Sequence, residues 1–313
     1  MPTDSHQELA SRFAQVRAAD LRRFPERAFL CRWAFNQEYH ASRDVQDILA
    51  WVAHIEMQAP GFDHAAWSLP VGPAERHLID VSAAFNDGVF ARLFGPDARN
   101  IQHQRLDFYN MSDWVLQHAY PRPLPERLER VLDFGAGFGR QAALWLSLGS
   151  RNTYVALDAI ESMYVAQTHY LGSAPFPLLE YLDAPGTFAI EDAGRPASFH
   201  VPGWRFDLLP TGFFDMVLCV QVLPEIHESV LFHSLSLFRR VLRDGGYLYV
   251  RDHGPAWMPG HQQLVPEILP RFGFVLEFCP RWRDTQDLHG LPQIWRKVES
   301  GTPGPRPLAH PSE

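Results

Sequence analysis

Residues 131–140 read VLDFGAGFGR, an apolar run that ends near an acid and is followed by glycines at alternate positions. The apolar start predicts a buried strand. The glycines that follow it, Gly135, Gly137 and Gly139, predict a turn whose backbone can approach a ligand without a side chain between them. The stretch therefore predicts a strand–turn–helix unit that binds a ligand through its loop.

The chain around this stretch alternates between strand and helix patterns. Strands are predicted at residues 130–134, 153–158, 197–201, 214–223 and 247–252, and helices at 140–149, 160–172 and 228–246. Residues 263–278 and 291–298 predict a last helix and two closing strands. The pattern FDMVLCVQVL has no polar alternation, which is typical of a strand in a parallel sheet. The alternation predicts a doubly wound α/β sheet over residues 126–298.

The first 125 residues predict a helical N-terminal region. Helical spacing occurs at residues 4–24, 43–57 and 73–95, and large aromatic side chains are frequent throughout. One interpretation is a helical layer packed by bulky side chains; the other is a cap whose aromatic residues wall a substrate pocket. The Pro-rich residues 299–313 predict a disordered tail.

Composition excludes several classes of protein. Twenty-eight basic residues against 36 acidic ones give a formal charge of −8, without a basic block that would attract nucleic acid. Three scattered cysteines, Cys31, Cys219 and Cys279, predict neither a disulfide framework nor a zinc site. The N-terminus does not read as a signal peptide, and no apolar run reaches the roughly 20 residues of a membrane span. A cytoplasmic protein is expected, with its oligomeric state left open.

The residues next to the glycines distinguish between two adenosine-bearing ligands. A nicotinamide or flavin fingerprint, Gly-x-Gly-x-x-Gly/Ala, would place a small residue where Arg140 stands. Asp133, two residues before the first glycine, suits instead a ligand with a cationic amino-acid end. Asp158 closes the next predicted strand, where a carboxylate can accept hydrogen bonds from both ribose hydroxyls. The combination favours S-adenosylmethionine, which has no pyrophosphate.

With these motifs in this order, residues 129–298 resemble the class I S-adenosylmethionine-dependent methyltransferases. VLDFGAGFGR followed by LDAIESMYVAQTHYLG is similar, within that superfamily, to the sugar O-methyltransferases found with glycan or specialised-metabolite genes. The resemblance implies a Rossmann-like sheet of seven strands, one of them antiparallel, under the helical N-terminal cap. It also implies methyl transfer to a small-molecule acceptor.

The resemblance assigns donor-binding roles to positions in the glycine loop and at the ends of later strands. These positions are Asp133, Gly135, Ala136, Gly137, Asp158, Ala159 and Gln221. Asp133 would lie near the methionine amino end and Asp158 at the ribose, whereas Ala159 or Ile160 would touch the adenine edge and Gln221 the sulfonium. Three residues are alternatives for the contact to the adenine amino group: Asp183, Trp204 and Asp207.

Candidate catalytic residues follow the predicted strands at residues 214–223 and 247–252. Glu225 and His227 come after one strand, and Asp252 and His253 after the next, at the edge where ligands bind in open α/β sheets. Either histidine could act as a general base at neutral pH. Alternatively, Glu225, Asp252 and a histidine could hold Mg²⁺, although the spacing does not specify a metal site. His233 is expected to pack or to face solvent.

The leading hypothesis is an O-methyltransferase whose acceptor is a sugar or a glycosylated or specialised metabolite. The sequence after the fourth main strand reads VLPEIHES and lacks the Asn/Asp-Pro-Pro-Tyr segment common in amine and nucleobase methyltransferases. A methyltransferase of a natural-product amine or carboxylate is the alternative. A non-catalytic nucleoside-binding protein and a nicotinamide dehydrogenase rank below it.

Overall fold

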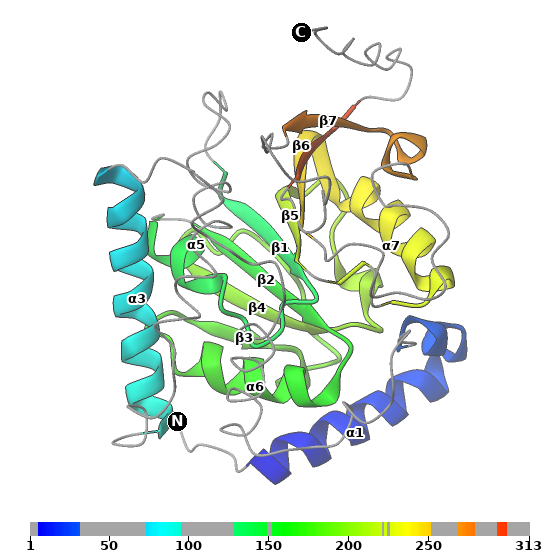
Figure 1. Ribbon diagram of the computed structural model, residues 1–313. Helices are drawn as coiled ribbons and strands as arrows, with labels where there is room; N and C mark the ends of the chain where they lie inside the picture. The colour runs from blue at the N-terminus through cyan, green and yellow to red at the C-terminus, as the bar shows by residue number, and fades with distance from the viewer. Residues whose placement is uncertain are drawn as a thin grey trace, which may run out of the picture.

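The computed structural model describes residues 6–31, 73–94, 128–148, 152–220, 222–223, 226–251, 268–278 and 293–298. Most of these residues form one twisted sheet with helices on both faces (Figure 1). The predicted helix at residues 43–57, the predicted tail and most of the N-terminal aromatic residues lie outside the described parts.

The sheet has eight strands in the order β3-β4-β2-β1-β5-β6-β8-β7. In chain order they are β1 (Arg130–Phe134), β2 (Thr153–Asp158), β3 (Leu178–Glu180), β4 (Ala197–Pro202), β5 (Phe214–Val220), β6 (Leu242–Arg251), β7 (Phe274–Phe278) and β8 (Gln293–Lys297). Strands β1 to β6 pair in parallel, and β8 runs antiparallel to both β6 and β7. The single antiparallel strand agrees with the expectation from the resemblance.

The prediction of seven strands is wrong by one, because β3 adds a short strand outside β4. Glu180, at the end of β3, accepts a hydrogen bond from the Tyr164 hydroxyl and pairs with Nδ1 of His200 on β4 at 2.7 Å. Burial alone would raise the pKa of Glu180, but His200 and the hydrogen bonds lower it. This contact joins residues that are distant in sequence and fixes β3 to the sheet edge.

The two faces of the sheet bury separate clusters of apolar side chains. Along each strand, alternate residues point to opposite faces. One face packs against α5 (Ala142–Leu148), α6 (Glu161–Gly172) and α3 (Pro73–Phe94). The other face packs against α7 (Glu228–Val241), with Leu30 of the N-terminal segment in the same cluster. Helices therefore cover both faces, as expected for a parallel sheet.

The boundary between α7 and β6 differs from the prediction. The helix was expected to stop at the glycine pair near residue 246, but it ends at Val241 and the chain continues directly into β6. Gly245 has φ 72° and lies where the pairing of β5 with β6 shifts register. The glycines therefore form an irregularity within a strand rather than a helix cap.

The N-terminal helix α1 (His6–Arg23) lies along α6, and the following 3₁₀ turn η1 (Pro25–Cys31) reaches α7 (Figure 1). Phe13 packs against Tyr164 and Trp204, each with ring centroids 5.0 Å away. Asp20 accepts hydrogen bonds from the Tyr181 hydroxyl (2.7 Å) and from the Trp204 indole (2.9 Å). We call α1 and η1 together the N-terminal strap.

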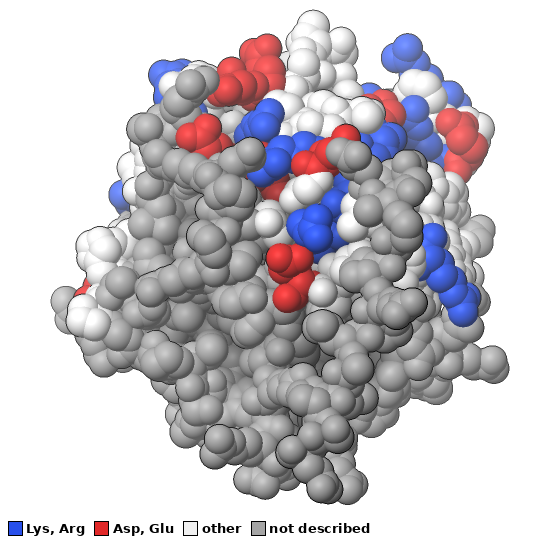
Figure 2. Space-filling model, turned by 90° about the horizontal axis from the view of Figure 1, so that it is seen from above, with Lys and Arg blue, Asp and Glu red and all other residues white. Residues whose placement is uncertain are grey.

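Charged side chains of both signs lie beside one another on the face shown in Figure 2. Within the protein, the buried Asp215 carboxylate accepts hydrogen bonds from the backbone N–H of Arg130 at 2.8 Å and from the Arg243 guanidinium at 2.7 Å. This buried carboxylate ties the start of β1 to β5 and β6. No helix among the described residues is long and apolar enough to span a membrane.

Candidate functional site

The glycine loop follows β1 and has left-handed backbone geometry at all three glycines. Gly135, Gly137 and Gly139 have φ 71°, 58° and 90°, which side chains disfavour. A Cβ at Gly135 would also lie 2.3 Å from Cγ2 of Val222, in the segment after β5. Only glycine therefore fits at residue 135 with Val222 in place. The predicted approach of a ligand to this loop remains a prediction.

Asp158, at the end of β2, is connected to this loop by hydrogen bonds. Its side chain is buried, and its Oδ2 accepts the backbone N–H of Gly137 at 3.2 Å and Nε2 of Gln167 at 3.3 Å. Its Oδ1 accepts the backbone N–H of Ile160 at 2.9 Å. The spacing of Asp158 from the glycines thus brings the carboxylate directly beside the loop.

Burial raises the pKa of Asp158 from 3.8 to about 7, although backbone hydrogen bonds from Ile160, Gly137 and Ala159 act in the opposite direction. The nearby Asp133 carboxylate adds to the increase. Hydrogen bonds to the ionised carboxylate would lower this pKa. A ligand that donates hydroxyl hydrogens to Asp158 would therefore bind best when the carboxylate is ionised.

Asp133 lies on the helix-covered face that packs against α5 and α6. It is buried and accepts a hydrogen bond from the Tyr154 hydroxyl on the neighbouring strand, at 2.5 Å. Burial, and then the Asp133 charge, raise the pKa of Tyr154 well above its usual value. Asp133 does not belong to the lining of the cavity described next, so a role at the methionine amino end remains a prediction.

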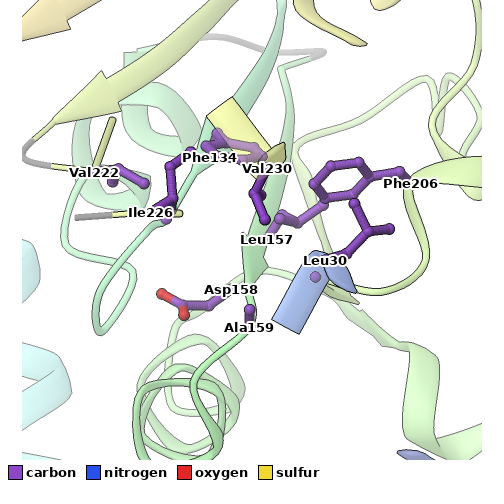
Figure 3. A pocket seen from close by; sticks show the side chains of 11 residues that line it. Leu30, Phe134, Leu157, Asp158, Ala159, Phe206, Val222, Ile226 and Val230 are labelled. Carbon is purple, nitrogen blue, oxygen red and sulfur yellow. The ribbon is translucent and has the colours of Figure 1, made fainter. Parts of the chain in front are cut away.

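A small apolar cavity opens between the glycine loop, the end of β2 and the strap (Figure 3). Its lining consists of Leu30, Phe134, Gly135, Leu157, Asp158, Ala159, Gly203, Phe206, Val222, Ile226 and Val230. Among the described residues of this lining, Asp158 is the one with a charged side chain. The cavity volume is about 20 Å³, far below the several hundred Å³ of a small-molecule site, so binding requires its wall to move outward.

Ala159 and Gly203 form the floor of the cavity at the ends of β2 and β4. A Cβ at Gly203 would lie 2.7 Å from that of Ala159, so the two segments approach closely only because residue 203 is glycine. Ala159 was one of two predicted adenine contacts and does line the cavity. The other, Ile160, contributes its backbone N–H to Asp158 instead.

The three alternatives for the adenine amino contact do not line the cavity. Asp183 pairs with Arg12, Asp207 pairs with Arg27 and Arg205, and the fully buried Trp204 donates to Asp20. Trp204 and Asp207 therefore join the strap to the loop after β4, and Asp183 joins it to the turn after β3. The cavity wall is formed there by Phe206 in η5 (Phe206–Leu208), which sequence reasoning missed together with Leu30 and Gln167.

Of the remaining residues predicted to bind the methyl donor, the structure describes Gly135 and Ala136. Gly135 lines the cavity, whereas the Ala136 side chain is buried in the cluster under α5 and α6. Gln221 lies outside the described residues. Among the catalytic candidates, Glu225, Asp252 and His253 also lie outside them.

His227 is exposed and begins α7 as its N-cap. Its Nδ1 accepts the backbone N–H of Ser229 at 3.2 Å. The preceding residue, Ile226, lines the cavity, so His227 follows directly from the cavity wall. His233 packs against the rings of Phe206 and Phe29, and burial, followed by the charge of Arg240, lowers its pKa. A packed His233 agrees with the expectation.

No group of three or more His, Cys, Asp or Glu side chains within the described ranges is placed to hold a metal ion. Cys219 lies buried in β5.

A known family of protein domains matches the part of the chain that contains the glycine loop and Asp158. Residues 132–250 match a family model described as a methyltransferase domain. No curated protein sequence matches the chain significantly.

The solved structures to which this chain is similar include the following methyltransferases. An S-adenosylmethionine-dependent methyltransferase from Mesorhizobium loti is 18% identical, with a TM-score of 0.40 over 59% of this chain and 98% of that one. The Burkholderia thailandensis 1,6-didemethyltoxoflavin-N1-methyltransferase, bound to S-adenosylhomocysteine, is 19% identical, with a TM-score of 0.36 over 73% and 91%. The CurJ carbon methyltransferase is 14% identical, with a TM-score of 0.43 over 83% and 73%.

Proposed function

We propose that this chain, whose residues 132–250 match a methyltransferase domain, is a class I S-adenosylmethionine-dependent methyltransferase that methylates a hydroxyl of a small molecule. The leading acceptor is a sugar or a glycosylated or specialised metabolite. The observation that carries the donor part is the Asp158 carboxylate, held beside the Gly137 N–H at the wall of an apolar cavity. The carboxylate matches the hydroxyls of a ribose, and the apolar wall, once it has moved outward, matches an adenine.

The proposal for the acceptor rests on the segment after β5. The described residues there, Val222, Leu223 and Ile226, are aliphatic, and two of them line the cavity. A planar nitrogen acceptor is usually held by an aromatic, proline-rich segment at this place, which the sequence lacks. A hydroxyl acceptor is the better match to this segment, and its weak nucleophilicity calls for a base.

His227 is the proposed base within the described part of the chain. Methyl transfer is an in-line displacement, so alignment of acceptor and methyl group lowers the barrier. A base that takes the hydroxyl proton adds about 10²–10⁴-fold. His253 is the alternative base. A Mg²⁺ site with Glu225 and Asp252 is the other proposal for activating the hydroxyl.

The donor is tested by calorimetry with S-adenosylmethionine, S-adenosylhomocysteine and NAD. Wild-type protein should bind the first two and not NAD, and Asp158→Ala should weaken binding by about 1–3 kcal/mol, because donor hydroxyls lose their acceptor. Binding of NAD, or unchanged donor affinity in the variant, would contradict the donor assignment.

The acceptor is tested with radiolabelled donor and matched panels of sugars, glycosylated metabolites, amines and carboxylic acids, with and without a chelator. Methyl transfer to an oxygen of a sugar or glycoside is expected, and mass spectrometry with NMR identifies the atom. Transfer to nitrogen or to a carboxylate alone would refute the acceptor proposal. Loss of activity with chelator and recovery with Mg²⁺ would favour the metal over a histidine base.

Two substitutions distinguish the proposed role of His227 as a general base from its role as the N-cap of α7. His227→Ala removes both the base and the cap, whereas His227→Ser keeps an N-cap and removes only the base. Single-turnover rates should fall about a hundredfold in both. Recovery of the rate in His227→Ser would show that the histidine serves only the helix.

A further inference from the structure

Gln167, on α6, connects the glycine loop to Asp158. Its side chain is fully buried. Its Nε2 donates to the carbonyl oxygen of Gly137 and to Oδ2 of Asp158, the second over 3.3 Å. Gly137 donates its own N–H to the same carboxylate oxygen over 3.2 Å. The three residues thus close a ring of hydrogen bonds between helix, loop and strand end.

The orientation of the Gln167 amide is fixed by its neighbours. Nε2 contacts two acceptors, a carbonyl oxygen and a carboxylate oxygen, so the nitrogen and not the oxygen must face the loop. The other end of the amide, Oε1, is buried and has no hydrogen-bond partner among the residues that the structure describes. A buried acceptor without a donor lowers stability.

The ring has two effects on the carboxylate. Two donors on Oδ2 restrict rotation of the Asp158 carboxyl group about its Cβ–Cγ bond. An N–H donor also favours the ionised form of a carboxylate. This matters at Asp158, because burial opposes ionisation there. The cost at Oε1 and the benefit at Asp158 together point to ligand binding rather than to folding.

We infer that Gln167 is a positioning residue of the donor site, which fixes the Asp158 carboxylate and the Gly137 loop for the ribose of the donor. The inference rests on the proposed function, because it assumes that S-adenosylmethionine binds at Asp158. Gln167 acts through these two residues and need not touch the donor.

The test compares Gln167→Met with the control Thr168→Val. Methionine has the length of glutamine without its N–H groups. Thr168 is the next residue of α6, and its hydroxyl donates a hydrogen bond to Oε2 of Glu180 at 3.1 Å. Thr168→Val therefore also removes a side-chain hydrogen bond of α6, but one that does not involve Asp158. The affinity for S-adenosylhomocysteine is measured by calorimetry from about pH 5.5 to 9, and thermal unfolding is measured without ligand.

Gln167→Met should weaken binding about tenfold at neutral pH. Its affinity should reach the plateau at a higher pH, with the midpoint raised by about half a unit or more. Its melting temperature should stay close to that of wild type, because the substitution removes an unpaired buried acceptor together with the hydrogen bonds of Nε2. Thr168→Val should retain wild-type affinity and midpoint.

Three results would overturn the inference. One is an unchanged affinity and midpoint in Gln167→Met. Another is an equal loss of affinity in Thr168→Val. The third is failure of both Gln167→Met and Gln167→Leu to fold, which would make Gln167 a structural residue. If wild-type protein binds no donor, the proposed function fails as well, which distinguishes that failure from one confined to Gln167.

Discussion

The buried carboxylate of Asp158 predicts that the donor-free protein loses stability as the pH rises towards neutrality. Burial raises its pKa from 3.8 to about 7 in the folded protein. The folded protein therefore binds this proton more tightly than the unfolded chain does. The resulting stabilisation is complete below pH 3.8 and is lost as the pH passes through 7. Asp158→Asn removes this titration.

The size of the effect follows from the two pKa values. They differ by about three units, and each unit corresponds to about 1.4 kcal/mol. The contribution of Asp158 to the free energy of unfolding should therefore fall by about 4 kcal/mol between about pH 4 and pH 8. Bound donor should reduce this loss, because ribose hydroxyls stabilise the ionised carboxylate.

The assay is urea unfolding of wild type and Asp158→Asn at intervals across this pH range. Other titrating groups are common to both proteins, so they cancel in the difference between the two free energies of unfolding. That difference should change by about 4 kcal/mol in favour of the variant as the pH rises. If the free energies of unfolding of the two proteins change with pH in the same way, the pKa of Asp158 is not raised in the folded protein.

Three further substitutions test the loop, the base and the strap. Gly135→Ala should abolish donor binding, measured by calorimetry, because its methyl group collides with Val222 and its φ of 71° is strained; near-normal affinity would contradict the packing. His227→Ala should slow single-turnover methyl transfer about a hundredfold, whereas His233→Ala should mainly lower the melting temperature; equal rates would exclude His227 as the base. Arg27→Gln, which breaks the 2.7 Å ion pair of the strap, should speed release of S-adenosylhomocysteine in stopped-flow experiments, and an unchanged rate would show that the strap does not control exchange.

The main sheet could be predicted because its strands are buried on both faces and read as uninterrupted apolar runs. The weakly indicated strand at residues 197–201 is confirmed as β4, and the closing strands β7 and β8 are also present. Strand β3 could not be predicted, since it depends on the contact between Glu180 and His200 rather than on local pattern. The start of β6 was missed because glycines near residue 245 resemble a helix stop.

The candidate donor site could be predicted only where local spacing defines it. Asp158 lies beside Gly137 because the strand–loop–helix–strand unit fixes both. Leu30 and Phe206 reach the cavity through packing between segments far apart in the chain, which periodicity does not reveal. Gln167 looks like an ordinary helical residue in the sequence, and its role follows from the face of α6 that it occupies.

If the proposed donor binds in the cavity behind the strap, the spent donor can leave only when the strap moves. Leu30 closes a cavity of about 20 Å³, and its segment is held to the loop after β4 by the Arg27–Asp207 pair. S-adenosylhomocysteine is nearly as large as the donor, so it must displace the same wall on leaving. A first round of methylation would then be faster than later ones. Rapid-quench measurements should show a burst of one methylated product per protein molecule, followed by a slower steady rate set by reopening.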